Sequence, residues 1–176
     1  MGSEPSPTTA EVGVVIVAAG ESQRMNGVDK VLAPVFGTPL FLHSLNTFQN
    51  VSQIDHIAIA LNKDNVQAGY SLLNTQGWGK VRALIVGGPT RRASVALCLR
   101  ALPSTKWVLV HDGARPMIDE GIVSRGLSAV VLTGAAVPVV RSVDTIKYHD
   151  ELGTIINTLP NETIGLAQTP QVFLTS

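Results

Sequence analysis

The 176-residue chain is 45% hydrophobic and only 15% charged, a composition that supports one domain with a sizeable core. Its 13 Lys and Arg residues balance 13 Asp and Glu residues, so the formal net charge is zero. That balance argues against a protein whose main partner is nucleic acid, because such proteins carry a basic surface.

The first ten residues, MGSEPSPTTA, are predicted to form a disordered tail, because they are rich in Ser, Pro and Thr. They contain no basic segment followed by an apolar stretch, so they do not resemble a secretory signal. Residues 11–176 are expected to form a single domain. The longest apolar runs, such as VGVVIVAAG, fall short of the ~20 residues that a membrane helix needs, so no membrane association is predicted.

Short apolar runs then alternate with segments of helical periodicity. The runs predict strands over 12–19, 56–61, 81–86 and 107–111. The segments between them predict helices over 39–49, 65–74 and 91–102, the last with Thr90 as its N-cap. This alternation is typical of an α/β fold with a mostly parallel sheet flanked by helices. In such sheets ligands bind beyond the carboxyl ends of the strands.

The third predicted helix contains Cys98, the chain's one cysteine. An internal disulfide is therefore impossible, and the cysteine content suits a reducing cytoplasm, which is the location we expect. No His and Cys cluster has metal-ligand spacing, so no structural zinc site is predicted.

A further helix is predicted from about Asp119 to Leu132, followed by a strand over 135–140. From Arg141 onward, β-branched and polar residues alternate around 150–153, which predicts a β-hairpin. A hairpin that projects from an α/β body has unpaired edges, and a second subunit is one way of pairing them.

The loop after the first strand, AAGESQR, carries almost no side chain at Ala18, Ala19 and Gly20. A ligand could lie directly on this backbone, or the small residues could serve packing alone. Arg24 and Lys30 follow, either as solvated loop cations or as groups that bind a dense anion. The glycine-rich dinucleotide and Walker fingerprints are both absent, which makes an NAD-binding dehydrogenase a poor interpretation.

The segment GGPTRRASV places Gly88 just before a helix start, and Ser94 in the first turn of that helix. Free N–H groups and the Ser94 hydroxyl, which we expect to be available, would favour an anion or a base edge. The alternative is ordinary helix capping.

The segment LVHDGARP places Asp112 and Arg115 three residues apart after a strand. The carboxylate could accept hydroxyl protons and the guanidinium could bind a phosphate, so the pair could hold a phosphorylated polyol. Alternatively, the pair is an ion pair that stabilises the turn. His111 is predicted to be a core histidine, and Thr169 precedes Pro170 in an extended conformation, with a hydroxyl that could face the site.

Together and in this order, six segments resemble the 2-C-methyl-D-erythritol 4-phosphate cytidylyltransferases of the non-mevalonate isoprenoid pathway: AAGESQRM, DKVLAPV, GGPTRRASV, VLVHDGARP, DTIK and QTPQVF. They span residues 12–173. The resemblance implies a Rossmann-like nucleotidyltransferase fold with a protruding β-arm, over about 142–159, that joins a homodimer. It also implies a reaction in which CTP, with Mg2+ on its phosphates, and the sugar-alcohol phosphate give a CDP-linked polyol and pyrophosphate.

The resemblance assigns roles residue by residue. Arg24 and Lys30 would grip the triphosphate around its reacting phosphorus. Contacts to cytidine would come from Ala18, Ala19, Gly20, Gly88 and Ser94. The acceptor would be bound by Asp112, Arg115 and Thr169, and by Thr145 across the dimer. The attacking phosphate is already ionised at neutral pH, so the reaction needs cations and alignment rather than a general base.

Three departures from the family pattern keep two alternatives open. Pro89 stands where the family usually has an acidic residue near the cytosine, and Asn161 lies in a stretch where an arginine is common. The sequence stops at FLTS, so we expect the C-terminal end of the family fold to be missing. The alternatives are a ribitol 5-phosphate cytidylyltransferase and a catalytically impaired homologue that binds CTP.

Overall fold

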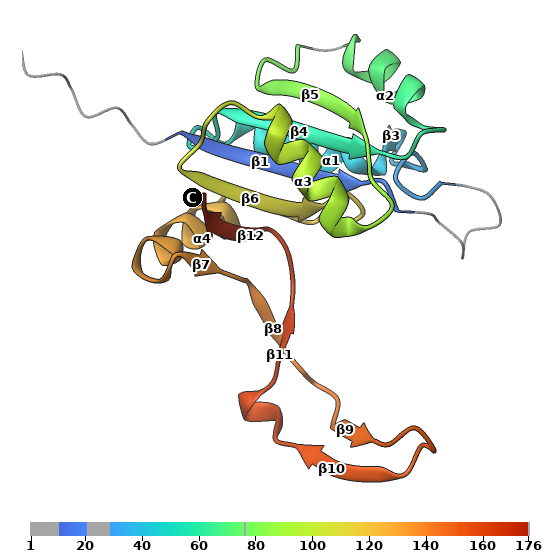
Figure 1. Cartoon of the computed structure of the whole chain (residues 1–176), viewed down its shortest axis with the longest axis vertical. Helices are drawn as coiled ribbons and strands as arrows, with labels where there is room; N and C mark the ends of the chain where they lie inside the picture. The colour runs from blue at the N-terminus through green and yellow to red at the C-terminus, as the bar shows by residue number, and fades with distance from the viewer. Residues whose placement is uncertain (1–10, 21–28, 76, 176) are drawn as a thin grey trace, which may run out of the picture.

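The structure, a computed structural model, describes residues 11–20, 29–75 and 77–175 (Figure 1). The predicted tail over 1–10 and the predicted triphosphate ligand Arg24 lie outside the described residues.

The body of the molecule is a six-stranded sheet in the order β5-β4-β1-β6-β12-β7. Four strands run parallel: β1 (Val12–Ala18), β4 (His56–Leu61), β5 (Val81–Val86) and β6 (Trp107–Asp112). Strand β12 (Gln171–Leu174) is antiparallel both to β6 and to the short β7 (Ala135–Ala136). The predicted α/β class with a mostly parallel sheet is therefore confirmed.

Strand β1 is the centre of the core, because it pairs with β4 on one side and β6 on the other. Its residues Val14, Val15 and Ile16 are fully buried. Since neighbouring side chains of a strand point to opposite faces, Ile16 belongs to the core on one face and Val15 to the core on the other. Both faces of this strand are thus covered, as its unbroken apolar run predicts.

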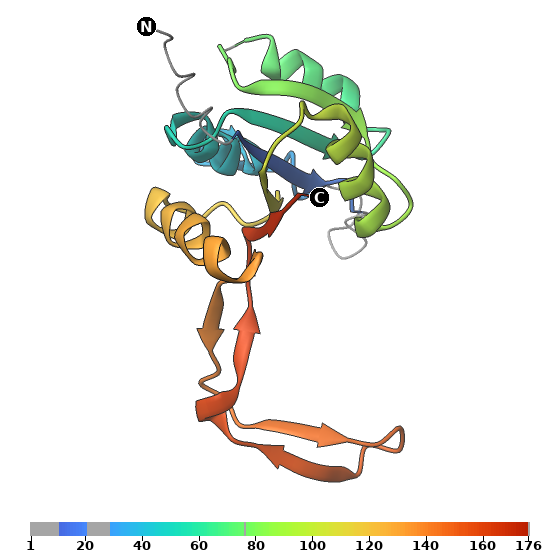
Figure 2. The same ribbon diagram turned by 60° about the vertical axis from the view of Figure 1, so that its left-hand side comes forward.

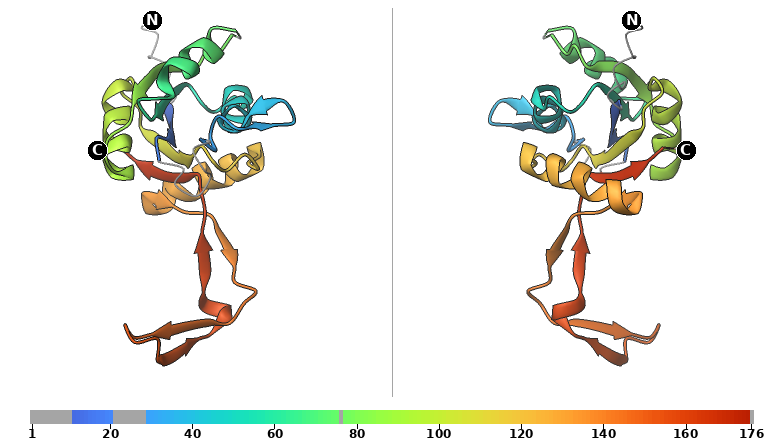
Figure 3. Two further views of the ribbon diagram at one scale, coloured as in Figure 1. Left: turned by 90° about the vertical axis from the view of Figure 1, so that its right-hand side faces the viewer. Right: turned by 90° about the vertical axis from the view of Figure 1, so that its left-hand side faces the viewer.

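Four helices surround the sheet: α1 (Leu40–Asn50), α2 (Val66–Leu73), α3 (Arg91–Ala101) and α4 (Glu120–Thr133). Helices α1 and α4 pack in the same cluster as Ile16, whereas Cys98 of α3 packs in the cluster of Val15 (Figures 1 and 3). Thr90 caps α3 as predicted, because its hydroxyl oxygen accepts a hydrogen bond from the Ala93 N–H at 3.1 Å.

The predicted single strand over 135–140 is wrong. Pro138 divides it, because a proline has no N–H to donate to a ladder. The part before Pro138 is β7 of the main sheet, and the part after it, β8 (Val139–Arg141), pairs with β11 (Gly165–Ala167). The chain leaves the body at this point.

Beyond β8 and β11 the chain forms a long arm that projects from the body (Figures 1 and 2). Its outer part is a hairpin of β9 (Ile146–His149) and β10 (Ile155–Leu159), as predicted, followed by a short 3-10 turn, Asn161–Thr163. The loop between β9 and β10 is closed by Asp150, whose Oδ1 accepts hydrogen bonds from the Leu152 and Thr154 N–H groups at 3.0 and 2.8 Å. The arm therefore spans 139–167, a longer segment than the predicted 142–159.

The arm exposes much apolar surface. Val143 is 92% exposed, and Tyr148, Ile155 and Ile156 are each more than half exposed. A smaller hairpin of β2 (Pro34–Val35) and β3 (Thr38–Pro39) leaves Phe36 at its tip fully accessible. Within the described part of the chain, none of the helices has both the length and the apolar character needed to cross a membrane.

Candidate active site

The carboxyl ends of β1, β5 and β6 meet in a cleft of about 970 Å³. Parallel strands bring their ends to one edge of the sheet, which is why three segments far apart in sequence converge here. The described residues that line the cleft include Ala18, Ala19, Gly20, Lys30, Gly88, Pro89, Thr90, Arg91, Ser94, Asp112, Ala114 and Arg115. The prediction that the polar motifs share one rim is confirmed.

The loop after β1 is packed closely against its neighbours. A Cβ atom added at Gly87 would lie 2.2 Å from the Ala19 Cβ, and one at Gly113 would lie 2.8 Å from the Ala18 Cβ. The small residues are therefore required for packing, which was one of the two interpretations of this loop. The same small residues line the cleft, so close packing of the loop and a cleft wall with few side-chain atoms have one cause.

Ser94 lies at the cleft, but its hydroxyl is not available in the way predicted. The side chain is 2% exposed, and Oγ accepts a hydrogen bond from the Gly88 N–H at 3.1 Å. The hydroxyl itself lies 3.1 Å from the Thr90 carbonyl oxygen and 3.4 Å from that of Gly88, to either of which it can donate. The sequence shows a helix start here, but the local pattern does not show that the serine turns back onto the preceding loop. Its structural role is to hold the Gly88 turn.

Lys30 lies on the rim of the cleft and follows Asp29, whose carboxylate accepts three hydrogen bonds. Asp29 accepts hydrogen bonds through Oδ2 from the side-chain amides of Asn62, at 2.5 Å, and Asn65. Its Oδ1 accepts a third from the Val31 N–H at 3.1 Å. These bonds tie the segment around Lys30 to the loop after β4. No local sequence pattern indicates these contacts, because Asn62 and Asn65 are 33 and 36 residues away from Asp29 in the chain.

Asp112 is shared by two arginines. Arg115 Nε donates to Oδ2 at 3.2 Å, so the ion pair that was the alternative interpretation of this motif is present. Arg91 Nε donates to Oδ1 at 3.0 Å, and its Nη2 lies 3.0 Å from the same oxygen. In the sequence Arg91 indicates only a helix start, and its contact with Asp112 was not predicted. The one available signal was its position directly after the cap of a helix that begins at the cleft.

His111 is a core histidine, as predicted. It is fully buried, its ring meets Phe48 edge-on at 5.2 Å, and burial lowers its pKa from 6.5 to about 4. Its Nε2 lies 3.0 Å from the Arg115 carbonyl oxygen, and its Nδ1 lies 3.0 Å from the Thr169 hydroxyl. Thr169 is itself 9% exposed, so its hydroxyl faces the interior behind Asp112 rather than the cleft.

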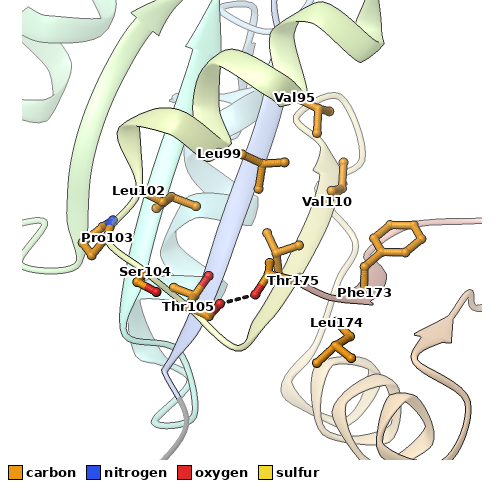
Figure 4. A pocket seen from close by; sticks show the side chains of 11 residues that line it. Val95, Leu99, Leu102, Pro103, Ser104, Thr105, Val110, Phe173, Leu174 and Thr175 are labelled. Carbon is orange, nitrogen blue, oxygen red and sulfur yellow. Dashed lines mark hydrogen bonds between the residues drawn. The ribbon is translucent and has the colours of Figure 1, made fainter.

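The remaining predicted contact, Thr145, lies on the exposed arm between β8 and β9 and does not line the cleft of its own chain. A second hollow, of about 560 Å³, lies between α3 and the strands β6 and β12, and is lined by residues of the middle and C-terminal part of the helix (Figure 4). Its walls are mostly apolar, with Leu99, Val110 and Phe173 among them, and it shares none of its lining residues with the cleft.

Comparisons with known proteins agree with this geometry. The family model described as 2-C-methyl-D-erythritol 4-phosphate cytidylyltransferase, IspD, matches residues 12–176. A protein of that name from Dehalococcoides mccartyi is 43% identical over 163 residues, which cover 93% of this chain and 72% of the relative. One from Clostridium novyi is 37% identical, with 90% of this chain and 70% of the relative covered.

Solved structures show the same similarity. The 4-diphosphocytidyl-2C-methyl-D-erythritol synthase of Anaerococcus prevotii aligns with a TM-score of 0.82 at 28% identity, covering 94% of this chain and 72% of that one. The 2-C-methyl-D-erythritol 4-phosphate cytidylyltransferase of Thermus thermophilus aligns with a TM-score of 0.68 at 35% identity, covering 93% and 70%.

Proposed function

Because this chain belongs to the family of 2-C-methyl-D-erythritol 4-phosphate cytidylyltransferases, we propose that its cleft is where the family's reaction takes place. The chain is a nucleotidyltransferase that transfers a cytidylyl group from CTP to 2-C-methyl-D-erythritol 4-phosphate in isoprenoid precursor synthesis. The observation that carries the proposal is the convergence of the β1, β5 and β6 ends on one cleft that also contains Lys30, Arg91 and Arg115.

We assign the nucleoside half of CTP to the ends of β1 and β5. Ala18, Ala19 and Gly20 line the cleft with little side chain, and Gly88 lines it too. Ser94 takes part by holding the Gly88 turn, since its hydroxyl is occupied by Gly88 and Thr90. Pro89 lines the same part of the cleft and contributes neither a carboxylate nor an N–H to base recognition.

The triphosphate is assigned to Lys30 and to Arg24, the latter outside the described residues. Two anions must approach each other in this reaction, so positive charge at the reacting phosphorus lowers the barrier. The hydrogen bonds that Asp29 accepts from the Asn62 and Asn65 side chains keep the Lys30 segment at the rim, which supports this role.

The acceptor is assigned to Asp112 and Arg115. A planar guanidinium can bind a phosphate through two N–H groups, and a carboxylate can accept hydrogen bonds from polyol hydroxyls. Thr169 supports this half of the site from behind, through its bond to the Asp112 N–H at 3.3 Å.

The bond changes follow from the substrates. A phosphate oxygen of the acceptor attacks the α-phosphorus of CTP, and the bond from that phosphorus to the oxygen bridging to the β-phosphate breaks. Pyrophosphate leaves with the electron pair of that bond. The attacking oxygen is already ionised at neutral pH, so no side chain has to remove a proton.

We propose that Mg2+ accompanies CTP, since this ion is commonly bound through substrate phosphates together with waters. Asp112, the one carboxylate among the described lining residues of the cleft, is already paired with Arg91 and Arg115. Among residues 11–20, 29–75 and 77–175, no three His, Cys, Asp or Glu side chains are grouped so as to hold a metal. The donor set therefore suits an ion carried by the nucleotide, where it would neutralise phosphate charge.

We also propose a homodimer joined through the arm and a cytoplasmic location. The exposed Val143, Tyr148, Ile155 and Ile156 provide apolar surface of the kind that a second copy would cover. In such a dimer Thr145 would reach the partner's acceptor. Sedimentation at micromolar concentration should show a dimer, and a stable monomer would refute this part of the proposal.

The activity is tested by measuring pyrophosphate release from CTP and Mg2+ with 2-C-methyl-D-erythritol 4-phosphate, and in parallel with ribitol 5-phosphate. We expect turnover with the first acceptor to exceed that with the second. Faster turnover with ribitol 5-phosphate would reassign the acceptor. Absence of turnover with both, with CTP binding retained in calorimetry, would identify an impaired homologue.

A further inference from the structure

The residue directly before Asp112 is buried and makes two polar contacts that the reaction described above does not use. The side chain of His111 is fully buried, and each of its ring nitrogens lies 3.0 Å from an oxygen. One of these oxygens is the carbonyl of Arg115 and the other is the hydroxyl of Thr169. Both partners belong to residues that the proposed function places in the acceptor half of the site.

The chemistry of the two oxygens determines the tautomer. A carbonyl oxygen only accepts, so the proton of the imidazole must be on Nε2, facing Arg115. Nδ1 is then an acceptor in the neutral ring, and the Thr169 hydroxyl donates to it. The Thr169 oxygen in turn accepts a hydrogen bond from the Asp112 N–H at 3.3 Å. The result is a closed set of three hydrogen bonds that begins and ends on the Asp112–Arg115 turn.

This set joins the turn to the root of the arm. Thr169 lies two residues before β12, and its neighbour Gln168 accepts a hydrogen bond on Oε1 from Arg115 Nη1. The Gln168 N–H donates to the Pro138 carbonyl oxygen at 2.8 Å, at the other root of the arm. The buried hydrogen bonds of His111 and the exposed hydrogen bonds of Gln168 therefore hold the Asp112–Arg115 turn against the two segments, at Pro138 and at Gln168, where the arm joins the body.

We infer that His111 is a positioning residue for acceptor binding, which fixes the Asp112–Arg115 turn and Thr169 relative to each other through a neutral, Nε2-protonated ring. The inference rests on the proposed function. Any buried histidine needs partners for its ring nitrogens, so the inference rests on which residues supply them. Here both are paired, and both pairs lie on the acceptor side of the cleft rather than on the CTP side.

The test is steady-state kinetics on three variants. His111→Leu removes both hydrogen bonds, His111→Asn keeps an acceptor near the position of Nδ1, and His111→Gln keeps a donor near the position of Nε2. We expect His111→Leu to raise the KM for the methylerythritol phosphate about tenfold or more, the size expected for losing buried hydrogen bonds. The KM for CTP should stay within about twofold, and Asn and Gln should each recover part of the loss.

Phe48→Leu is the matched control, because Phe48 packs against the His111 ring and makes none of its hydrogen bonds. This variant should lower Tm while leaving the acceptor KM unchanged. The inference is overturned if the acceptor KM is unchanged in folded His111→Leu, if both KM values rise together, or if Asn and Gln are no better than Leu.

Nitrogen-15 NMR of the histidine rings at pH 7 gives a readout that does not depend on turnover. The His111 ring should be neutral with its proton on Nε2, and a ring protonated on Nδ1 or on both nitrogens would overturn the inference. Failure of the proposed function is recognised separately, as a wild-type enzyme without turnover. Should His111→Leu not fold, the Asn and Gln variants and the ring tautomer still decide the outcome.

Discussion

Arg91 and Asp112 connect the two halves of the cleft, since Nε of Arg91 at the start of α3 donates to Oδ1 of Asp112 at the end of β6, at 3.0 Å. The two residues are 21 positions apart in sequence. The same carboxylate is held through its other oxygen by Arg115. The proposed nucleotide side and the proposed acceptor side are therefore joined by one shared carboxylate.

We expect Arg91→Ala to raise the KM for the acceptor with little loss of stability. Both side chains of the pair are partly exposed, at 47% and 32%, and exposed ion pairs contribute only about 0–1 kcal/mol. Urea unfolding and kinetics on one preparation separate the two effects. Arg92→Ala, which removes the neighbouring cation, is the control. If Arg91→Ala and Arg92→Ala have the same KM for the acceptor, Arg91 does not contribute to acceptor binding.

Lys30→Ala should lower kcat/KM by ~100-fold or more, because a lost contact to transition-state charge commonly costs that much. The same expectation holds for Arg24→Ala. Lys30 is exposed, so Tm should change little. Lys106→Ala removes an equally exposed lysine that lies over Trp107, at the opposite end of β6, and should retain activity. If kcat/KM of the Lys30→Ala variant equals that of the wild type, Lys30 has no role in catalysis.

Gly87→Ala should weaken CTP binding and lower the free energy of unfolding by about 1–3 kcal/mol, as overpacking usually does. The added methyl would lie 2.2 Å from the Ala19 Cβ and 2.9 Å from Ser94 Oγ, so the loop after β1 has to move. Gly79→Ala is the control, because its nearest neighbour would be Gln49 Nε2 at 3.9 Å. Calorimetry with CTP and urea unfolding measure both effects, and CTP affinity equal to wild type would contradict the expectation.

Stability should depend on pH through His111. The unfolded chain binds the proton near pH 6.5, whereas burial lowers the pKa of His111 in the folded chain to about 4. In that window the unfolded state holds more protons, so the free energy of unfolding falls as pH falls, by ~3 kcal/mol if the full shift is realised. The charged groups nearest to the ring are Asp112, which favours its protonation, and Arg115, which opposes it. Between pH 7 and 4 the free energy of unfolding should fall more steeply for the wild type than for His111→Gln. If it falls equally in both, His111 does not cause the pH dependence.

Cys98 should not react with a thiol reagent while the chain is folded. The thiol is fully buried, and burial raises its pKa to about 12, so almost no thiolate exists at pH 8. Absorbance with Ellman's reagent should show no labelling in buffer and one thiol in guanidinium chloride. Rapid labelling in buffer would mean that α3 leaves the sheet readily.

Most of the body could be predicted from periodicity, because each parallel strand is a short apolar run between helical segments. Pro138 was a local signal that the strand over 135–140 is divided, but the change of sheet between β7 and β8 depends on distant partners and has no local signal. Strand β12 reverses direction relative to β6, and no local pattern shows this either.

The candidate site was predicted in the same uneven way. Segments that line the cleft carry their own signal, as at Gly88 or Asp112, because glycine and charge stand out after an apolar strand. Side chains that act through others carry none. Asp29 accepts hydrogen bonds from Asn62 and Asn65, which only the assembled sheet brings close to it. Ser94 contacts Gly88, six residues away, in a local contact that the residue type alone does not indicate. The motif resemblance supplied the proposed site residues and gave no indication of the residues that support them.

The contact between Ala19 and Gly87 constrains how this cleft could be re-engineered. The space between their α-carbons accommodates one methyl group, so a larger residue on either strand end competes for volume that the other already occupies. Saturation libraries at single positions would therefore return mostly misfolded clones here. Reciprocal exchange, with glycine introduced at 19 whenever 87 is enlarged, removes the closest of the contacts that oppose a larger side chain.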